Sequence, residues 1–240
     1  MYNHIQRLNN QIEDTKKLIE NTHALLMENP SDPMLEYMIA QDKALLASLQ
    51  HTRVQATLDY LKTITAPTQL IDELYPSSPF EISPFDVAHK LGIKVIKNPL
   101  LDDSEAGKCY INNDIVIEYK GYISHNRERF TVAHELGHVV KHMAHSNNTS
   151  FRDSSELLYA RNDYIDSKDP TEKEADVFAG ELLIPKQKLD LLLSSIQGDD
   201  RISTKLLCDI FKVSEGAIYH TLNKYGLGNS LKIKKEYSWL

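Results

Sequence analysis

The stretch Phe130-Thr-Val-Ala-His-Glu-Leu-Gly-His-Val-Val140 predicts a buried helix that carries a metal site. Residues four apart lie on one face of a helix, so the imidazoles of His134 and His138 can bind one ion. Glu135 is rotated about 100° from His134, and its carboxylate can act on a water beside that ion. Two ligands and a general base at this spacing are typical of helical zinc peptidases. The alternative is a chance match on a buried helix, but the apolar flanks would hold both rings rigidly, which favours the metal site.

The composition describes a soluble globular protein, with one domain and a second element or with two small domains. The chain has 240 residues, of which 41% are hydrophobic and 25% are charged, and this is ordinary for a globular fold. No apolar run approaches the length that spans a bilayer, and Met1–Arg7 leads into a polar helix rather than a signal core. Cys109 and Cys208 fit reduced, buried thiols. We therefore expect a cytoplasmic protein without a membrane segment.

Residues 1–65 are predicted to form an antiparallel helical hairpin that resembles a coiled coil. The first helix spans residues 3–28 and the second about 34–62, and the prolines in 29–33 separate them. The heptad positions of the first helix are Ile5, Leu8, Ile12, Thr15, Ile19, Thr22 and Leu26. The apolar residues of the second include Leu35, Met38, Leu45, Leu46, Leu49, Leu58 and Leu61. The hairpin is either a packing arm or homodimer seam, or a docking arm for a partner protein.

A small antiparallel-type sheet is predicted between the hairpin and the metal helix. Residues 66–82 contain three prolines and are interpreted as a linker, and Ser83–Gly92 has the cap and stop residues of a short helix. Residues 93–97 alternate as a strand does, and 109–111 and 115–119 flank a turn of Asn and Asp residues. The last of these strands is a candidate edge for pairing an extended substrate.

The third metal ligand is expected on a helix that begins at Asp169. A catalytic zinc needs three protein ligands and one open position. Glu172 and Asp176 are four apart and share a face, so Glu172 can bind the ion while Asp176 accepts the far N–H of a ligand histidine. Alternatively, Glu172 completes a capping box with Asp169, and Glu174 is then the reserve ligand.

Other polar residues near the metal helix receive lesser roles. A third histidine six residues beyond His138 is excluded, because that position is Ala144. His142 continues the helical series, but three histidines along one straight helix cannot converge on one ion, so His142 is a surface or supporting group. In the mechanism that we expect, Glu135 takes a proton from a zinc-activated water and returns it to the leaving amine. The candidate donors for the oxyanion lie in the polar stretch 144–168: Tyr159, Arg161, Tyr164 and His145.

The motifs Arg129–His138 and Glu172–Pro185 resemble those of the ImmA/IrrE family of bacterial zinc-dependent regulatory peptidases. The resemblance covers about residues 80–226. It implies a gluzincin-like α+β fold, mostly helical with a small sheet, and zinc held by the positions of His134, His138 and Glu172 with Glu135 as base. It also implies a protein substrate, namely a helix-turn-helix repressor that silences a mobile element or a stress response.

Two features depart from the family pattern. Asp176 stands where the family more often has Asn, although a carboxylate also accepts a hydrogen bond. Residues 1–62 have no counterpart in the family's minimal domain. We therefore expect the hairpin, the linker, a zincin-like metallopeptidase domain at 83–198, and C-terminal helices with a tail at 199–240.

The C-terminal region has a helix-turn-helix outline over Ser203–Gly226. Its second helix presents only His220, Asn223 and Lys224 for bases, and Glu215 lies at its start. The net charge of −7 also disfavours direct DNA binding. The competing hypothesis is a non-proteolytic regulator that binds a repressor or DNA through the hairpin or these helices.

Overall fold

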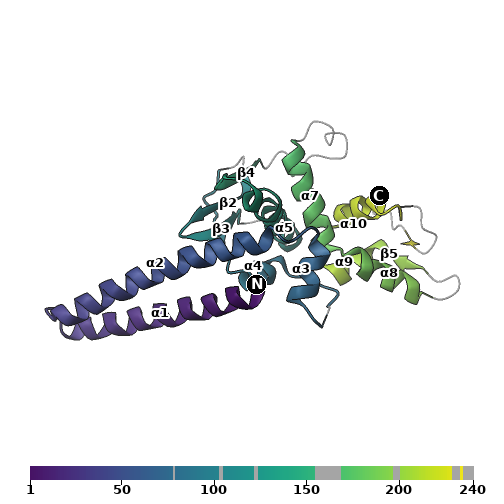
Figure 1. The fold of residues 1–240 in the computed structure, drawn as a ribbon. Helices are drawn as coiled ribbons and strands as arrows, with labels where there is room; N and C mark the ends of the chain where they lie inside the picture. The colour runs from purple at the N-terminus through teal and green to yellow at the C-terminus, as the bar shows by residue number, and fades with distance from the viewer. Residues whose placement is uncertain are drawn as a thin grey trace.

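Two long N-terminal helices project as an arm from a core of shorter helices and a four-stranded sheet (Figure 1). This computed structural model describes residues 1–77, 79–102, 105–121, 124–154, 169–196, 201–228 and 233–234. The expected α+β fold with an N-terminal helical hairpin is confirmed. None of the described helices is both long enough and apolar enough to cross a membrane.

The arm consists of α1 (Tyr2–Glu28) and α2 (Pro33–Leu61). Asp32 begins α2, because its side chain accepts a hydrogen bond from the Met34 amide at 2.9 Å and satisfies one of the unpaired N–H groups of the first turn. The heptad seam of α1 is buried or half-buried as predicted. Of the apolar residues on α2, Met38 and Leu45 are exposed, whereas Ile39 is buried in the seam.

The base of the arm is attached to the core by polar contacts. Thr57 on α2 donates to the Leu91 carbonyl at 3.0 Å, and Arg53 forms an ion pair with Asp114. Gly92, with φ of +71°, ends the short helix beneath the arm, and a Cβ there would lie 2.7 Å from Cδ of Arg53. The glycine therefore permits both the turn and the close approach of the arm.

The segment predicted to be a linker contains a buried helix, α3 (Pro67–Leu74). Pro67 occupies its first turn, where the missing N–H costs nothing. Leu70 and Ile71 are buried in the main core. The segment expected to be a linker, 66–82, thus contributes a helix to the core, because prolines that punctuate a chain also begin helices.

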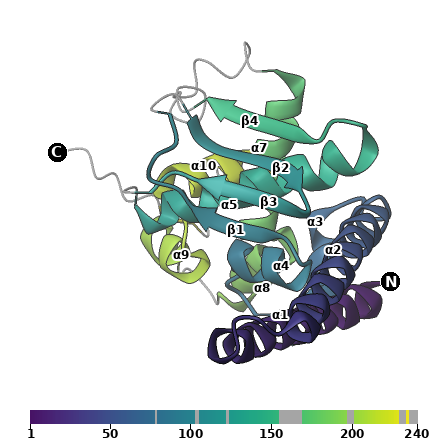
Figure 2. The ribbon, with the colours of Figure 1, turned by 90° about the vertical axis from the view of Figure 1, so that its left-hand side faces the viewer.

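The sheet contains β1 (Lys94–Lys97), β2 (Glu105–Asn112), β3 (Asp114–Tyr119) and β4 (Ser150–Ser154) in the order β1-β3-β2-β4. Figure 2 shows β4 at the top and β1 at the bottom. The β2–β3 and β2–β4 pairs are antiparallel, but β1 pairs with β3 in parallel.

The sheet is therefore mixed rather than antiparallel. Strand β3 has the antiparallel β2 on one side and the parallel β1 on the other. The strand proposed as a substrate edge, 115–119, is also corrected, since β3 is paired on both sides and β4 is a terminal strand. The predicted β2–β3 turn places Asn113 at φ of +58°, which suits a tight hairpin.

Helices pack on one face of the sheet and continue beyond it (Figure 2). In chain order these elements are α4 (Pro84–Lys90), α5 (His125–Lys141), η1 (Met143–His145), α7 (Pro170–Leu183), α8 (Lys186–Ser195), α9 (Thr204–Phe211) and α10 (Glu215–Lys224). A two-stranded parallel pair, β5 (Ile202–Ser203) and β6 (Ile233–Lys234), lies beside the last helices. The prediction for the polar stretch after η1 falls largely outside the described residues.

The C-terminal helices α9 and α10 are packed into the core. Leu207, Phe211 and Leu222 are buried, and the Tyr225 hydroxyl donates to the Ile184 carbonyl at 2.9 Å. The predicted cap at Ser214 is present, since its hydroxyl accepts a hydrogen bond from the Ala217 amide in the first turn of α10 at 3.3 Å. These contacts make the helix-turn-helix outline part of the core.

Candidate metal centre

Helices α5 and α7 approach each other closely enough for side chains of one to reach those of the other. A Cβ on Gly137 of α5 would lie 2.9 Å from Cα of Ala175 and 3.0 Å from its carbonyl oxygen on α7. Real Cβ atoms almost never come so near a backbone. A glycine within a helix costs about 1 kcal/mol relative to alanine, and the close contact explains why one stands here.

This close approach brings His134, His138 and Glu172 together. Nε2 of His134 lies 3.1 Å from Nε2 of His138. The Glu172 carboxylate lies 3.3 Å from each of these nitrogens, with Oε2 toward His134 and Oε1 toward His138. The two histidines are 0% and 1% exposed, and Glu172 is 12% exposed. All three donor atoms lie within 4.8 Å of one another, so they can hold one metal ion.

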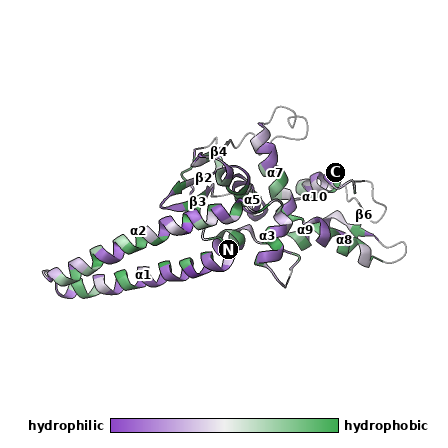
Figure 3. Ribbon diagram, in the orientation of Figure 1, coloured by the Kyte–Doolittle hydropathy of each residue, from purple (hydrophilic) through white to green (hydrophobic). Residues whose placement is uncertain are grey.

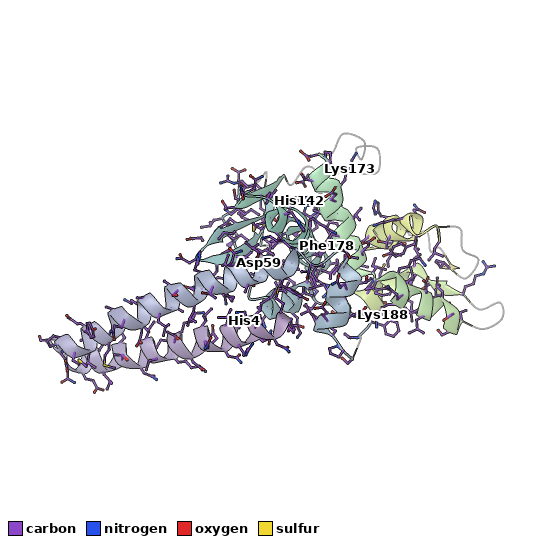
Figure 4. The ribbon with its side chains drawn as sticks, viewed as in Figure 1. His4, Asp59, His142, Lys173, Phe178 and Lys188 are labelled. Atoms are coloured by element: carbon purple, nitrogen blue, oxygen red, sulfur yellow. The ribbon has the colours of Figure 1, made fainter. Side chains whose placement is uncertain are left out.

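The reserve ligand, Glu174, points elsewhere. Its side chain is 64% exposed, and its carboxylate lies 3.9 Å from Nδ1 of His142. Nε2 of His142 donates to the carbonyl of Thr171, in the first turn of α7, at 3.0 Å (Figure 4). Burial lowers the pKa of His142. His142 therefore connects the C-terminal end of α5 with the start of α7, next to the metal-ligand cluster.

Asp176 orients the first histidine. Its Oδ1 lies 2.9 Å from Nδ1 of His134. A carboxylate acceptor places the proton on Nδ1, and Nε2 then presents its lone pair toward His138 and Glu172. The residue expected to accept the far N–H of a ligand histidine is in position to do so.

Glu135 lies beneath β2, opposite a glycine that sequence reasoning missed. Glu135 is 0% exposed, and a Cβ on Gly107 would collide with its Oε1. The same Cβ would lie 2.8 Å from Cγ2 of Thr131 on α5. A glycine inside a strand is a signal for close approach of another group, and this signal was available in the sequence.

A second unforeseen neighbour is Phe151 of β4. Its ring stacks on the His138 imidazole with centroids 5.3 Å apart and an interplanar angle of 17°. Beside it, a hollow of about 220 Å³ lies along β2 and β4 and is lined by Lys108, Cys109, Tyr110, Ser150, Phe151 and Arg152. The terminal strand thus borders the metal-ligand cluster.

Of the four candidate donors for the oxyanion, one lies among the described residues. His145 lies in η1 and is exposed. Tyr159, Arg161 and Tyr164 lie outside the described residues. All four remain predictions.

Residues 88–223 match the family described as IrrE N-terminal-like domain, peptidase M78. The matched segment is more than half of the chain and includes the whole sheet together with α5 and α7. The chain belongs to this peptidase family. No curated protein matches the sequence.

Family membership accounts for part of the molecule only. The IrrE-like segment contains all three candidate ligands as well as Glu135 and Asp176. It also includes α9 and nearly all of α10, which agrees with their packing into the core. The arm lies wholly outside the segment, so its purpose must be argued from its own residues.

Proposed function

We propose that this chain is a zinc-dependent endopeptidase that cleaves one specific protein, a helix-turn-helix transcriptional repressor. The observation that carries the proposal is the buried cluster of two imidazoles and one carboxylate beside Glu135. Three protein ligands of this kind are typical of catalytic zinc, which keeps a fourth position open. The resemblance to the ImmA/IrrE peptidases supports the repressor as substrate.

The spacing of the donor atoms fits zinc. Ligand atoms held about 2.0–2.1 Å from zinc at the tetrahedral angle lie roughly 3.3 Å apart. The two imidazole Nε2 atoms are 3.1 Å apart, and each lies 3.3 Å from a different oxygen of the Glu172 carboxylate. The tautomer that Asp176 imposes on His134 also presents a neutral nitrogen, as a zinc ligand must be.

In the proposed mechanism the protein positions Glu135, the general base, and shields its carboxylate from bulk solvent. His134, His138 and Glu172 would hold the zinc ion, which would supply a Lewis acid for the scissile carbonyl and lower the pKa of water. Glu135 accepts the proton of the attacking water on its carboxylate and delivers it to the leaving amine. The absent side chain at Gly107 gives that carboxylate its space. Burial of Glu135 strengthens its electrostatic interactions.

The substrate segment is proposed to bind along β4. This strand is terminal in the order β1-β3-β2-β4, so an extended peptide can add to it through main-chain hydrogen bonds. Phe151 belongs to β4 and stacks on His138, which places this strand beside the cluster. A peptide bound there would pass the metal ligands.

The test uses the full chain with, as candidate substrate, a helix-turn-helix repressor sought among the products of neighbouring genes. Metal content and cleavage are measured for wild type and for Glu135→Gln, Glu172→Ala and Glu174→Ala. We expect zinc without cleavage in Glu135→Gln, loss of both in Glu172→Ala, and wild-type behaviour in the exposed control Glu174→Ala. Normal cleavage by Glu135→Gln would overturn the mechanism.

The same assay separates proteolysis from the competing hypothesis. A regulator that acts by binding alone would sequester the repressor equally well as wild type and as Glu135→Gln, with no new fragment in either case. A DNA-binding regulator would instead retard operator DNA at physiological salt. Either result would replace the peptidase proposal.

A further inference from the structure

Helix α2 carries two parallel heptad rows, and only one of them faces α1. The inner row is Leu35, Ile39, Asp42, Leu46, Leu49 and Arg53, and each member is buried or half-buried. The second row, called here the outer row, is Met34, Met38, Gln41, Leu45, Ser48 and Thr52, and each member is exposed. The outer row keeps the 4-3-4-3-4 spacing that packs one helix on another. It is rotated about 100° from the inner row.

Two leucines of α1 extend the outer row. The hydrogen bond from Arg53 to Asn9 at 3.1 Å sets the register of the hairpin, which places Leu18 beside Leu45 and Leu25 beside Met38. Each of these four residues directly precedes a seam residue, so in an antiparallel pair they lie on the same flank. Figure 3 shows hydrophobic residues on both helices out to the tip of the arm.

The outer row faces away from the peptidase core. Gln50 of α2 contacts Asp114 of the sheet at 3.2 Å, and Thr57 bonds the core at Leu91. Gln50 and Thr57 follow Gln41 and Ser48 by nine residues, which corresponds to half a turn about the helix axis. The core therefore covers the opposite side of α2.

The exposed apolar surface is large enough for a stable contact. Five apolar side chains of this surface are between 36% and 62% exposed: Leu18, Leu25, Met34, Met38 and Leu45. With the polar members of the outer row they offer on the order of several hundred Å², against the roughly 800 Å² per partner of a standard interface. Patches of this size mark interaction sites, and Met is enriched in them.

We propose that the outer row pairs with the outer row of a second copy of this chain, so that two arms form a four-helix bundle. A two-fold contact sets residue i of one copy against residue j of the other and j against i, and an unpaired charge buried there would destabilise it. The outer row contains no charged residue. Its polar members, Gln41, Ser48 and Thr52, each carry both a donor and an acceptor, so they can bond one another across the contact. The inference does not depend on the metal site.

The test measures the mass of the full chain in solution by light scattering and sedimentation. Wild type is expected at twice 27.4 kDa, with a melting temperature that rises with concentration. The double variant Met38→Glu, Leu45→Glu is expected to run as a monomer with unchanged helix content. The matched control is Ala40→Glu, Ala47→Glu, which adds the same charges at exposed positions of α2 outside the outer row, and it should remain a dimer.

Three outcomes would overturn the proposal. Wild type that is monomeric at about 100 μM would show that the outer row serves another protein or none. A Met38→Glu, Leu45→Glu variant that stays dimeric would place the contact elsewhere. Loss of the dimer in the Ala40→Glu, Ala47→Glu control as well would show a general effect of charge on the arm.

Discussion

Two antiparallel helix pairs of the molecule, α5–α7 and α1–α2, differ in how much of their surface is buried. In the α5–α7 pair nearly every residue of α5 from Arg129 to Val140 is buried, and the backbones come close at Gly137. In the α1–α2 pair, beyond the base where α2 packs on the core, burial follows a single seam and much of the remaining surface is exposed. Metal ligands tolerate little displacement, and the faces of the first pair that carry them are enclosed. The second pair needs only its seam, and its outer surface is available for another molecule.

The largest loss of stability is expected when the buried guanidinium of Arg129, near the start of α5, is removed. Arg129 is 2% exposed and donates to Glu81 at 3.1 Å and to the carbonyls of Ile82 and Lys212 at 2.8 and 3.0 Å. Replacing Arg129 by Met should lower the free energy of unfolding by about 3–5 kcal/mol, because buried acceptors lose charge-assisted donors. Urea unfolding measures this change.

The matched control for Arg129 is Arg152 on β4. Its side chain is 73% exposed and lies 3.5 Å from Glu105. Replacing Arg152 by Met should change the free energy of unfolding by less than about 0.5 kcal/mol. Equal losses from the two substitutions would contradict the view that enclosure decides the effect.

The second prediction concerns the glycine above Glu135. In Gly107→Ala the new Cβ would displace the Glu135 carboxylate, so the turnover number for repressor cleavage should fall about 100-fold, in the range of a lost general base. Metal content should not change, because the three ligands are untouched. In the control Gly121→Ala the Cβ meets Cε of the flexible Lys97 side chain at 3.1 Å and Cβ of Pro99 at an ordinary contact distance of 3.5 Å, and activity should be retained. Normal turnover by Gly107→Ala would remove Glu135 from the chemistry.

The third prediction concerns the hydrogen bond behind the metal ligand. Asp176→Ala should weaken metal binding about 10–100-fold, because Nδ1 of His134 loses the acceptor that fixes its tautomer. Asp176→Asn keeps an acceptor oxygen and should lose less. Competition with a chelator measures the affinity. An Asp176→Ala protein that binds metal as tightly as wild type would show that packing alone orients His134.

The sequence predicts local features of the site better than contacts between distant segments. His134, His138 and Glu135 follow from spacing within one helix, and Asp169 signals the start of α7 through its cap, which is present at 2.9 Å. The choice between Glu172 as ligand and Glu172 as capping group needed the distance between two helices, which no local pattern contains.

The fold shows the same limit. The heptads predict the hairpin, but a helix with two adjacent apolar rows, as on α2, does not show which row its partner covers. The alternation of 93–97 predicts β1 but not its parallel partner. Gly107 signals a close approach without naming Glu135, since a strand's own residues do not specify what packs on it.

The fourth prediction tests how tightly the α5–α7 pair is packed. In Gly137→Ala the Cβ meets the Ala175 backbone, and overpacking costs about 1–3 kcal/mol, offset by about 1 kcal/mol of helix propensity. We expect a net loss of about 1 kcal/mol and weaker metal binding. Gly216→Ala in α10 meets only Oγ of Ser214 at 4.0 Å and should be neutral or stabilised. Thermal unfolding compares the two, and a stabilised Gly137→Ala would mean that the helices can separate without cost.

The smallest effect is expected on the exposed side of the arm. Nζ of Lys16 lies 2.7 Å from Oε1 of Glu13, and the two side chains are 44% and 60% exposed. The hydrogen bond from Lys16 lowers the pKa of Glu13. A carboxyl group with a lowered folded-state pKa stabilises the fold above its unfolded pKa, and this contribution is lost as the pH falls through the folded value.

Solvent screening keeps that contribution small, so Lys16→Ala should cost at most about 0.5 kcal/mol at neutral pH. The difference from wild type should shrink in about 1 M salt and as Glu13 becomes protonated in acid. Urea unfolding at pH 7 and pH 3 checks both directions. A loss near that of Arg129→Met would mean that the arm, like the metal helices, depends on its individual charges, and the contrast between the two helix pairs would fail.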